Sequence, residues 1–127
     1  MRLTIGFFSF AVTAVIAGGI GSQTRAEAPS SRPPAFAQCA GCHSTEPGKT
    51  LFGPSLAGVA GRPAGSLPGY AYSPALKNSK LVWNAATLDR WLTSPQKTVP
   101  GTRMPFNGIN DPAVRRTVIN YLLKLEK

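Results

Sequence analysis

Apolar residues recur at helical spacing in only two stretches of this 127-residue chain. In the first stretch, Leu88, Trp91 and Leu92 lie at i, i+3 and i+4, which places them on one helix face. Asn84 precedes them and is a favourable residue for capping a helix N-terminus. Pro95 is expected to end this helix, because the residue before a proline avoids the helical conformation.

The second stretch begins at Asp111-Pro112, a capping residue followed by a proline at the first helical position. Its apolar stripe runs to the C-terminus and consists of Val114, Val118, Tyr121, Leu122 and Leu125. Upstream, Pro34 suits the start of a short helix that carries Phe36 and leads into Cys39. Because no internal repeat and no strand pattern is evident, the predicted fold class is all-α, with short helices and long loops.

Glycine and proline are abundant, at 13 and 12 residues respectively, and they interrupt every stretch between the predicted helices. This content stays below the range typical of disordered chains, so one folded domain is expected. Such a chain has little regular structure from which to build a core. A bound apolar group would supply the missing mass, as covalent and metal staples do in other small folds.

Residues 1–26 have the features of a secretory signal peptide. Arg2 supplies the positive start, an apolar run follows, and cleavage is expected after Ala26. An uncleaved membrane anchor is the alternative, because about 18 apolar residues is the lower limit for a spanning helix. Residues 27–34 are predicted to form a flexible leader and residues 35–127 the folded domain, which in either case is exported into an oxidising compartment.

The most informative motif is Cys39-Ala40-Gly41-Cys42-His43, which holds both cysteines and the only histidine of the chain. C-x-x-C-H is the attachment signature of c-type haem. Two thiols one helical turn apart can reach two vinyl groups on one porphyrin edge, and the histidine is then carried beneath the iron. The sequence therefore predicts one covalent haem.

Two other interpretations of the motif are possible. Cys39 and Cys42 could form a redox disulfide of the thioredoxin type, which belongs in an alternating strand–helix context that this chain lacks. They could also form half of a zinc site. Such a site needs about four ligands, so carboxylates or a second chain would have to complete it.

Met104 is the second candidate iron ligand, in the loop Pro100-Gly101-Thr102-Arg103-Met104-Pro105-Phe106. A thioether is a soft ligand that suits haem iron opposite a histidine, and it raises the reduction potential. The alternative is that Met104 only fills space in the core. A single methionine between prolines is an unusual place for a core residue, and the rigid turn would aim its side chain.

From about Phe36 to Leu125 the chain resembles the class I c-type cytochromes, the mitochondrial-like and soluble bacterial electron carriers. The motifs that carry the resemblance are C-A-G-C-H, F-G-P-S-L, G-R, P-G-Y-A-Y-S, Trp83, S-P-Q-K-T-V-P-G-T-R-M-P-F and the C-terminal I-N-Y-L. The resemblance implies the cytochrome c fold, with helices and loops wrapped around one haem. It also implies thioether bonds at Cys39 and Cys42 and iron ligation by His43 and Met104.

The same resemblance implies roles for further residues. The Pro54 carbonyl would accept the other imidazole N–H, Thr102 would supply a pocket hydroxyl, and Phe106 would lie beside the exposed haem edge. The group expected to cage the haem propionates is Arg62, Tyr70, Tyr72, Ser73 and Trp83. Considered without the resemblance, these tyrosines and this tryptophan are ordinary core aromatics with one polar atom.

Three departures from the family pattern are visible. Pro33-Pro34 allow only a short first helix, which makes the usual crossing of the first and last helices a weaker expectation. Trp91 stands where the mitochondrial proteins have a tyrosine over the methionine. Leu76 stands where they have a buried asparagine, so the pocket behind the haem is expected to be drier.

The resulting functional hypothesis is a periplasmic monohaem electron carrier, not an enzyme. It would link a quinol-oxidising complex or a dehydrogenase to a terminal oxidase or reductase. A small haem peroxidase, working when Met104 leaves the iron, and a haem-based redox or ligand sensor are the alternatives. The chain is expected to act as a monomer, to meet membranes only by transient docking unless the signal is uncleaved, and to bind no nucleic acid.

The chain is strongly basic, with 14 Lys and Arg against five Asp and Glu and a formal net charge of +9. Such charge can simply keep a protein soluble. By the resemblance, Lys49, Lys97 and Arg103 surround the solvent-facing haem edge. A basic face there would steer the protein onto an acidic docking patch of its redox partner.

Overall fold

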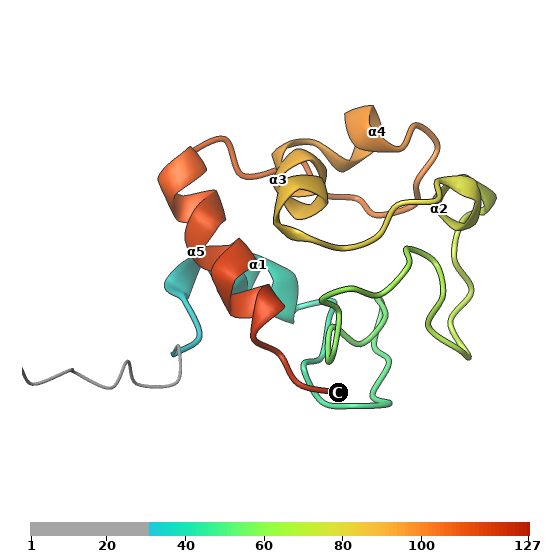
Figure 1. The fold of residues 1–127 in the computed structure, drawn as a ribbon, viewed down its shortest axis with the longest axis horizontal. Coiled ribbons are helices and arrows are strands. Elements are labelled where there is room, and N and C mark those ends of the chain that lie inside the picture. Colours follow the sequence, from blue (N-terminus) through green and yellow to red (C-terminus); the bar gives the residue numbers. More distant parts are fainter. Residues whose placement is uncertain (1–30) are drawn as a thin grey trace, which may run out of the picture.

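The computed structural model describes residues 31–127 and shows short helices joined by long loops (Figure 1). The predicted signal peptide and the first half of the predicted leader, residues 27–30, lie outside the described residues. The helices are η1 (Pro34–Phe36), α1 (Ala37–Ala40), α2 (Pro74–Asn78), α3 (Ala85–Thr93), α4 (Pro95–Thr98) and α5 (Pro112–Leu123). The only β-pairing within residues 31–127 is one isolated bridge between Pro63 and Val82, so the all-α prediction is confirmed.

Helix α3 begins where its cap predicts. The Asn84 side chain accepts the backbone N–H of Thr87 at 2.9 Å, and the Thr87 hydroxyl accepts the backbone N–H of Asn84 at 2.9 Å. This reciprocal pair satisfies two N–H groups that a helix start leaves unpaired. The predicted apolar residues of this helix are all buried. The helix ends before Pro95, which in turn opens α4.

Helix α5 also begins at its predicted cap, but its buried face differs from the prediction. The Asp111 carboxylate accepts the backbone N–H of Val114 at 3.1 Å. Val114 itself is 37% exposed, although the apolar stripe placed it in the core. Arg115 is buried instead, because its guanidinium donates hydrogen bonds to the Asp89 carboxylate and the Ile109 carbonyl. The rest of the buried face is Val118, Ile119 and Leu122.

The two ends of the folded domain pack against each other (Figure 1). Phe36 in η1 is 1% exposed, and its ring centroid lies 4.9 Å from that of Tyr121 in α5, edge to face. The Arg32 guanidinium lies 5.0 Å from the Phe36 ring centroid. The short first helix is therefore confirmed, and its crossing with the last helix is nevertheless present.

Helix α2 was not predicted. Its five residues contain one buried apolar side chain, Leu76, so no periodicity reveals it. Its N-terminal cap stabilises it instead, since the Ser73 hydroxyl accepts the Leu76 backbone N–H at 3.2 Å and Pro74 takes the first helical position.

No helix within residues 31–127 is both long and apolar enough to cross a membrane.

Candidate functional site

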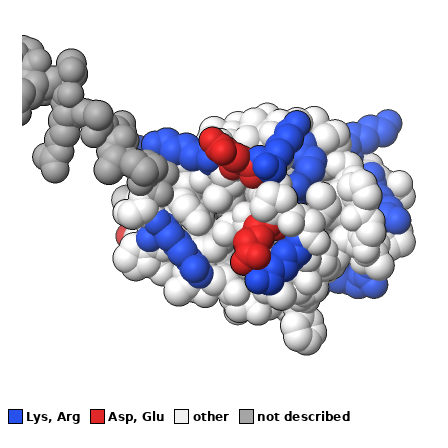
Figure 2. All heavy atoms as spheres, turned by 90° about the horizontal axis from the view of Figure 1, so that it is seen from below, with Lys and Arg blue, Asp and Glu red and all other residues white. Residues whose placement is uncertain are grey.

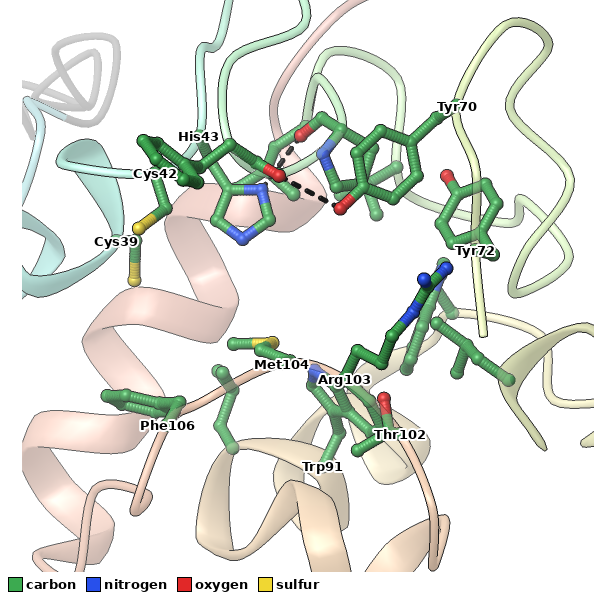
Figure 3. A pocket seen from close by; sticks show the side chains of 18 of the residues that line it. Cys39, Cys42, His43, Tyr70, Tyr72, Trp91, Thr102, Arg103, Met104 and Phe106 are labelled. Carbon is green, nitrogen blue, oxygen red and sulfur yellow. Dashed lines mark hydrogen bonds between the residues drawn. The ribbon is translucent and has the colours of Figure 1, made fainter. Parts of the chain in front are cut away.

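A cavity of about 350 Å³ lies in the middle of the molecule, between α3, α5 and the long loops (Figure 3). Every site residue expected from the sequence lines this one cavity. They are Cys39, Cys42, His43, Pro54, Arg62, Tyr70, Tyr72, Ser73, Trp83, Trp91, Thr102, Met104 and Phe106. Segments more than 60 residues apart in the sequence therefore meet at this site.

The two cysteines lie at one end of the cavity (Figure 3). Helix α1 carries Cys39, and its carbonyl accepts the backbone N–H groups of Cys42 at 3.1 Å and His43 at 2.9 Å. This continued turn puts both thiols on the cavity side. The thiols are not bonded to each other; Cys39 is buried and Cys42 is exposed. Burial raises the pKa of the Cys39 thiol above its ordinary value.

The His43 ring is fixed by the backbone that follows it. Its Nδ1 lies 2.8 Å from the Pro54 carbonyl oxygen, which can only accept, so Nδ1 carries the proton and Nε2 is left as a free donor atom for a metal. Burial lowers the pKa of His43, and the hydrogen bond to Pro54 partly opposes this shift. The imidazole is thus held neutral, which is the form that ligates metals.

Gly53 makes room for this ring. Its N–H donates to the Cys42 carbonyl at 2.7 Å, which pulls the loop against the C-x-x-C-H turn. A Cβ atom built on Gly53 would overlap the His43 imidazole. The close packing of loop and ring therefore requires a glycine at position 53.

Met104 faces His43 from the opposite wall of the cavity (Figure 3). It lies in the extended segment between α4 and α5, which also brings the buried Thr102 and the partly buried Phe106 to the cavity. The Met104 side chain is partly buried and packs against the apolar core. The imidazole and the thioether therefore approach one space from two sides.

Tyr70 and Tyr72, two of the residues expected to cage the propionates, lie at the end of the cavity away from the cysteines (Figure 3). Their ring centroids are 4.7 Å apart, edge to face. The Tyr70 hydroxyl donates to the Phe52 carbonyl at 2.9 Å. Burial raises the pKa of Tyr72, while the positive charge of Arg62 acts in the opposite direction.

Arg62 is held by two carbonyls of the preceding loop. Its guanidinium donates to the oxygens of Ala57 and Ser55, each at 2.9 Å. These bonds fix a positive charge at the cavity wall. Trp83, the remaining aromatic residue of this group, also lines the cavity, and its ring centroid lies 5.3 Å from that of Trp91.

Several lining residues were not singled out from the sequence. Phe52, 90% exposed, stands at the rim, and the apolar wall includes Leu56, Val59 and Leu122. Leu122 lies in the predicted apolar stripe, but a stripe does not distinguish a cavity wall from ordinary core. The others carry no chemical signature and reach the cavity only through the tertiary fold.

These residues fit a haem better than the other candidate groups. Two unpaired thiols, an imidazole with a free Nε2 and a thioether surround a mainly apolar space, which is a donor set of soft and nitrogen ligands suited to haem iron. No group of three or more His, Cys, Asp or Glu side chains within residues 31–127 is placed to hold a metal ion by itself. Fold and site together define a protein built around one covalently attached haem.

Comparison with known proteins agrees with this class. The chain is 47% identical over 93 residues to cytochrome c2 iso-2 of Magnetospirillum fulvum, covering 73% of this chain and 97% of that protein. It is 51% identical over 88 residues to cytochrome c2 of Rhodoblastus acidophilus, covering 68% and 82% of the two chains. The solved structure of cytochrome cH from Methylobacterium extorquens superposes with a TM-score of 0.66 at 50% identity, covering 69% and 89%. No family model matches the sequence.

The chain belongs to the class I c-type cytochromes. It carries one covalent haem c, as the C-x-x-C-H motif predicted, and it is an electron-transfer protein rather than an enzyme. The disulfide and zinc interpretations of Cys39 and Cys42 are thereby replaced, and so is the peroxidase alternative. Like other electron carriers of this family, it works with redox partners.

Proposed function

We propose that this protein carries single electrons through the periplasm, from a quinol-oxidising membrane complex or a dehydrogenase to a terminal oxidase or reductase. In this proposal residues 1–26 are a signal peptide, residues 27–34 are a leader, and the mature domain acts as a monomer that binds no nucleic acid. The observation that carries the proposal is the opposition of His43 and Met104 across the cavity, because two axial ligands leave no open site for a substrate.

Within this proposal, Cys39 and Cys42 would hold the haem by thioether bonds, and His43 Nε2 and Met104 Sδ would ligate its iron. The haem supplies a reversible one-electron change at its iron. The Pro54 carbonyl fixes the plane and tautomer of His43 through Nδ1, which also makes the imidazole a stronger donor.

The remaining residues control the surroundings of the iron. Leu76, Trp91 and the core behind them exclude water, so that little solvent has to reorganise when the charge changes. Arg62 and the hydroxyls of Tyr70 and Tyr72 provide positive charge and donors where the propionates would lie. Phe106 also lines the cavity and is partly buried, and it would lie beside the exposed edge of the haem.

The proposed docking face contains Lys49, Lys97 and Arg103, and the structure constrains how each contributes. Lys49 pairs with Glu46 at 2.9 Å, which reduces its local charge. Arg103 donates to the carbonyl of Ala71 across the cavity mouth, so it has a structural role as well. Lys97 is exposed on α4 and makes no hydrogen bond within residues 31–127, so its charge is the most available to a partner.

The visible spectrum of the exported protein tests the proposal most directly. We expect haem that survives acid–acetone extraction, and an oxidised form with the absorption band of thioether-ligated iron. Met104→Ala should abolish this band, lower the reduction potential and raise peroxidase activity, because it opens one axial position. Retention of both the band and the wild-type potential would show that Met104 is not the ligand.

A further inference from the structure

The segment that carries Met104 has few backbone bonds of its own. Thr102 N–H donates to the Val99 carbonyl at 3.1 Å at one end, and Ile109 N–H donates to the Leu92 carbonyl at 2.7 Å at the other. Between these two bonds, only the 3.0 Å contact of Phe106 N–H with the Met104 carbonyl is internal to the segment. Side chains from outside the segment must therefore hold the part next to Met104.

One such side chain is Gln96. Its amide nitrogen donates to the Thr102 carbonyl at 2.8 Å and lies 3.3 Å from the Met104 carbonyl. A primary amide has two N–H groups, so one nitrogen can serve both carbonyls at once. The two carbonyls belong to the turn that leads into Met104 and to Met104 itself. Gln96 thus contacts the backbone of the proposed ligand directly.

The helix that carries Gln96 is anchored to the rest of the fold. Gln96 lies in α4, and the Thr98 hydroxyl donates to the carbonyl of Arg90 in α3 at 2.8 Å and to that of Ser94 at 2.9 Å. Pro95, at the first position of α4, is almost fully buried. Because α4 is anchored to α3 in this way, movement of the Met104 segment away from the cavity has to break the Gln96 bonds.

We infer that Gln96 is a positioning residue that keeps Met104 in place, and that its amide sets how readily the thioether leaves the iron. This inference rests on the proposed axial role of Met104. A closed segment would keep the Met104 thioether within reach of the iron and would suppress the binding of external ligands. The hydrogen bond from Arg103 to the Ala71 carbonyl also holds the segment. It starts one residue before Met104, however, and connects the segment to a different loop, the one that carries Ala71.

The test uses ferric holoprotein titrated with imidazole, which binds only when Met104 leaves. Gln96→Glu keeps the length of the side chain and, when ionised, removes both donors, so its carboxylate faces two carbonyl oxygens. Gln96→Ala removes the contact altogether. We expect the apparent imidazole affinity to rise roughly three- to tenfold in Gln96→Ala, as the loss of a net hydrogen bond implies, and by more in Gln96→Glu.

Asn120→Ala is the matched control, because it removes an exposed carboxamide on α5 that makes no hydrogen bond within residues 31–127. It should leave the imidazole affinity unchanged. In the two Gln96 variants, the thioether band should also disappear at lower denaturant concentration while the unfolding midpoint of the helices moves little. A parallel shift of both signals would mean a general structural role and would overturn the inference.

Met104→Ala distinguishes a failure of the ligand assignment of Met104 from a failure of the positioning role of Gln96. If it raises imidazole affinity strongly and the Gln96 variants match the Asn120 control, the positioning role of Gln96 is wrong and the ligand assignment stands. If Met104→Ala leaves imidazole affinity unchanged, the ligand assignment itself is wrong, and the inference about Gln96 falls with it.

Discussion

At the scale of single residues, part of the cavity wall is formed by large, mainly apolar side chains. Leu76 is 8% exposed and Trp91 is 6% exposed, and both line the cavity. By the family resemblance, polar tyrosine and asparagine side chains occupy these places in the mitochondrial proteins. A dry wall disfavours the additional positive charge of ferric iron, because any charge is costly in apolar surroundings.

We therefore predict that Leu76→Asn lowers the reduction potential. A polar amide, with any water it retains, would stabilise the oxidised state more than the reduced one. Redox titration of the exported protein measures the change, and Leu76→Ile, which keeps the wall apolar, is the control. An increase in the potential of the Asn variant would contradict the explanation.

Individual site residues also show what short-range sequence patterns can predict. The spacing of Cys39, Cys42 and His43 defines their chemistry locally, so they could be identified without a fold. Gln96 and Phe52 could not, because an amide or an aromatic ring has many uses. Only the tertiary structure places Gln96 against the backbone next to Met104 and Phe52 at the cavity. The burial of Arg115 could not be predicted from the sequence either, since an arginine inside a helix is usually exposed.

At the scale of helices, Arg115 connects three segments. Its Nε donates to the Asp89 carboxylate of α3 at 2.8 Å, and its Nη1 donates to the carbonyl of Ile109 at 2.8 Å. The arginine side chain is 10% exposed. It thus fixes α5 to α3 and also holds the end of the segment that carries Met104.

We predict that Arg115→Ala lowers the free energy of unfolding by roughly 2 to 3 kcal/mol, because it removes charge-assisted hydrogen bonds from a buried position. Denaturant unfolding of the holoprotein followed by circular dichroism measures this. Arg116→Ala, on the exposed side of the same helix, should change stability by less than about 0.5 kcal/mol. Similar losses in the two variants would show that the buried contacts are not the cause.

Helix prediction succeeded where two signals agreed. In α3 and α5 an apolar stripe follows a capping residue, and both helices begin at the predicted cap. Helix α2 has a serine cap and a proline but only five residues, too few for a period to be seen. The pairing of η1 with α5 was also beyond local patterns, because it depends on contacts between the two ends of the domain.

At the scale of the whole molecule, the core is incomplete without its prosthetic group. The cavity lies where the helices converge, and its apolar lining would be exposed to water if it stayed empty. We therefore predict that Cys39→Ser or Cys42→Ser largely abolishes stable holoprotein and that the haem-free chain is poorly folded. Haem staining and thermal unfolding check this. A cooperative transition of haem-free protein near that of the holoprotein would refute it.

The charges of the molecule are widely distributed. Figure 2 shows Lys and Arg side chains scattered over one face, with few acidic residues between them. Net charge alone could therefore attract an acidic partner. An experiment has to separate this general attraction from the effect of a particular docking face. A suitable control is an exposed basic residue outside the proposed docking face, and Arg116 on α5 is exposed.

We predict that second-order electron transfer to an acidic redox partner slows as ionic strength rises. Lys97→Glu should slow it much more than Arg116→Glu, with the reduction potential nearly unchanged in both. Stopped-flow rates measured across a salt series test this. Equal effects of the two substitutions, which change the net charge equally, would mean that no particular face is used.

The contact between Phe36 and Tyr121 has a consequence for biosynthesis. Because the first helix of the domain packs on the last, the core cannot close until the ribosome has made nearly the whole chain. Until then Phe36 lacks the Tyr121 ring against which it packs. Closure of the domain therefore has to follow the synthesis of its C-terminal helix.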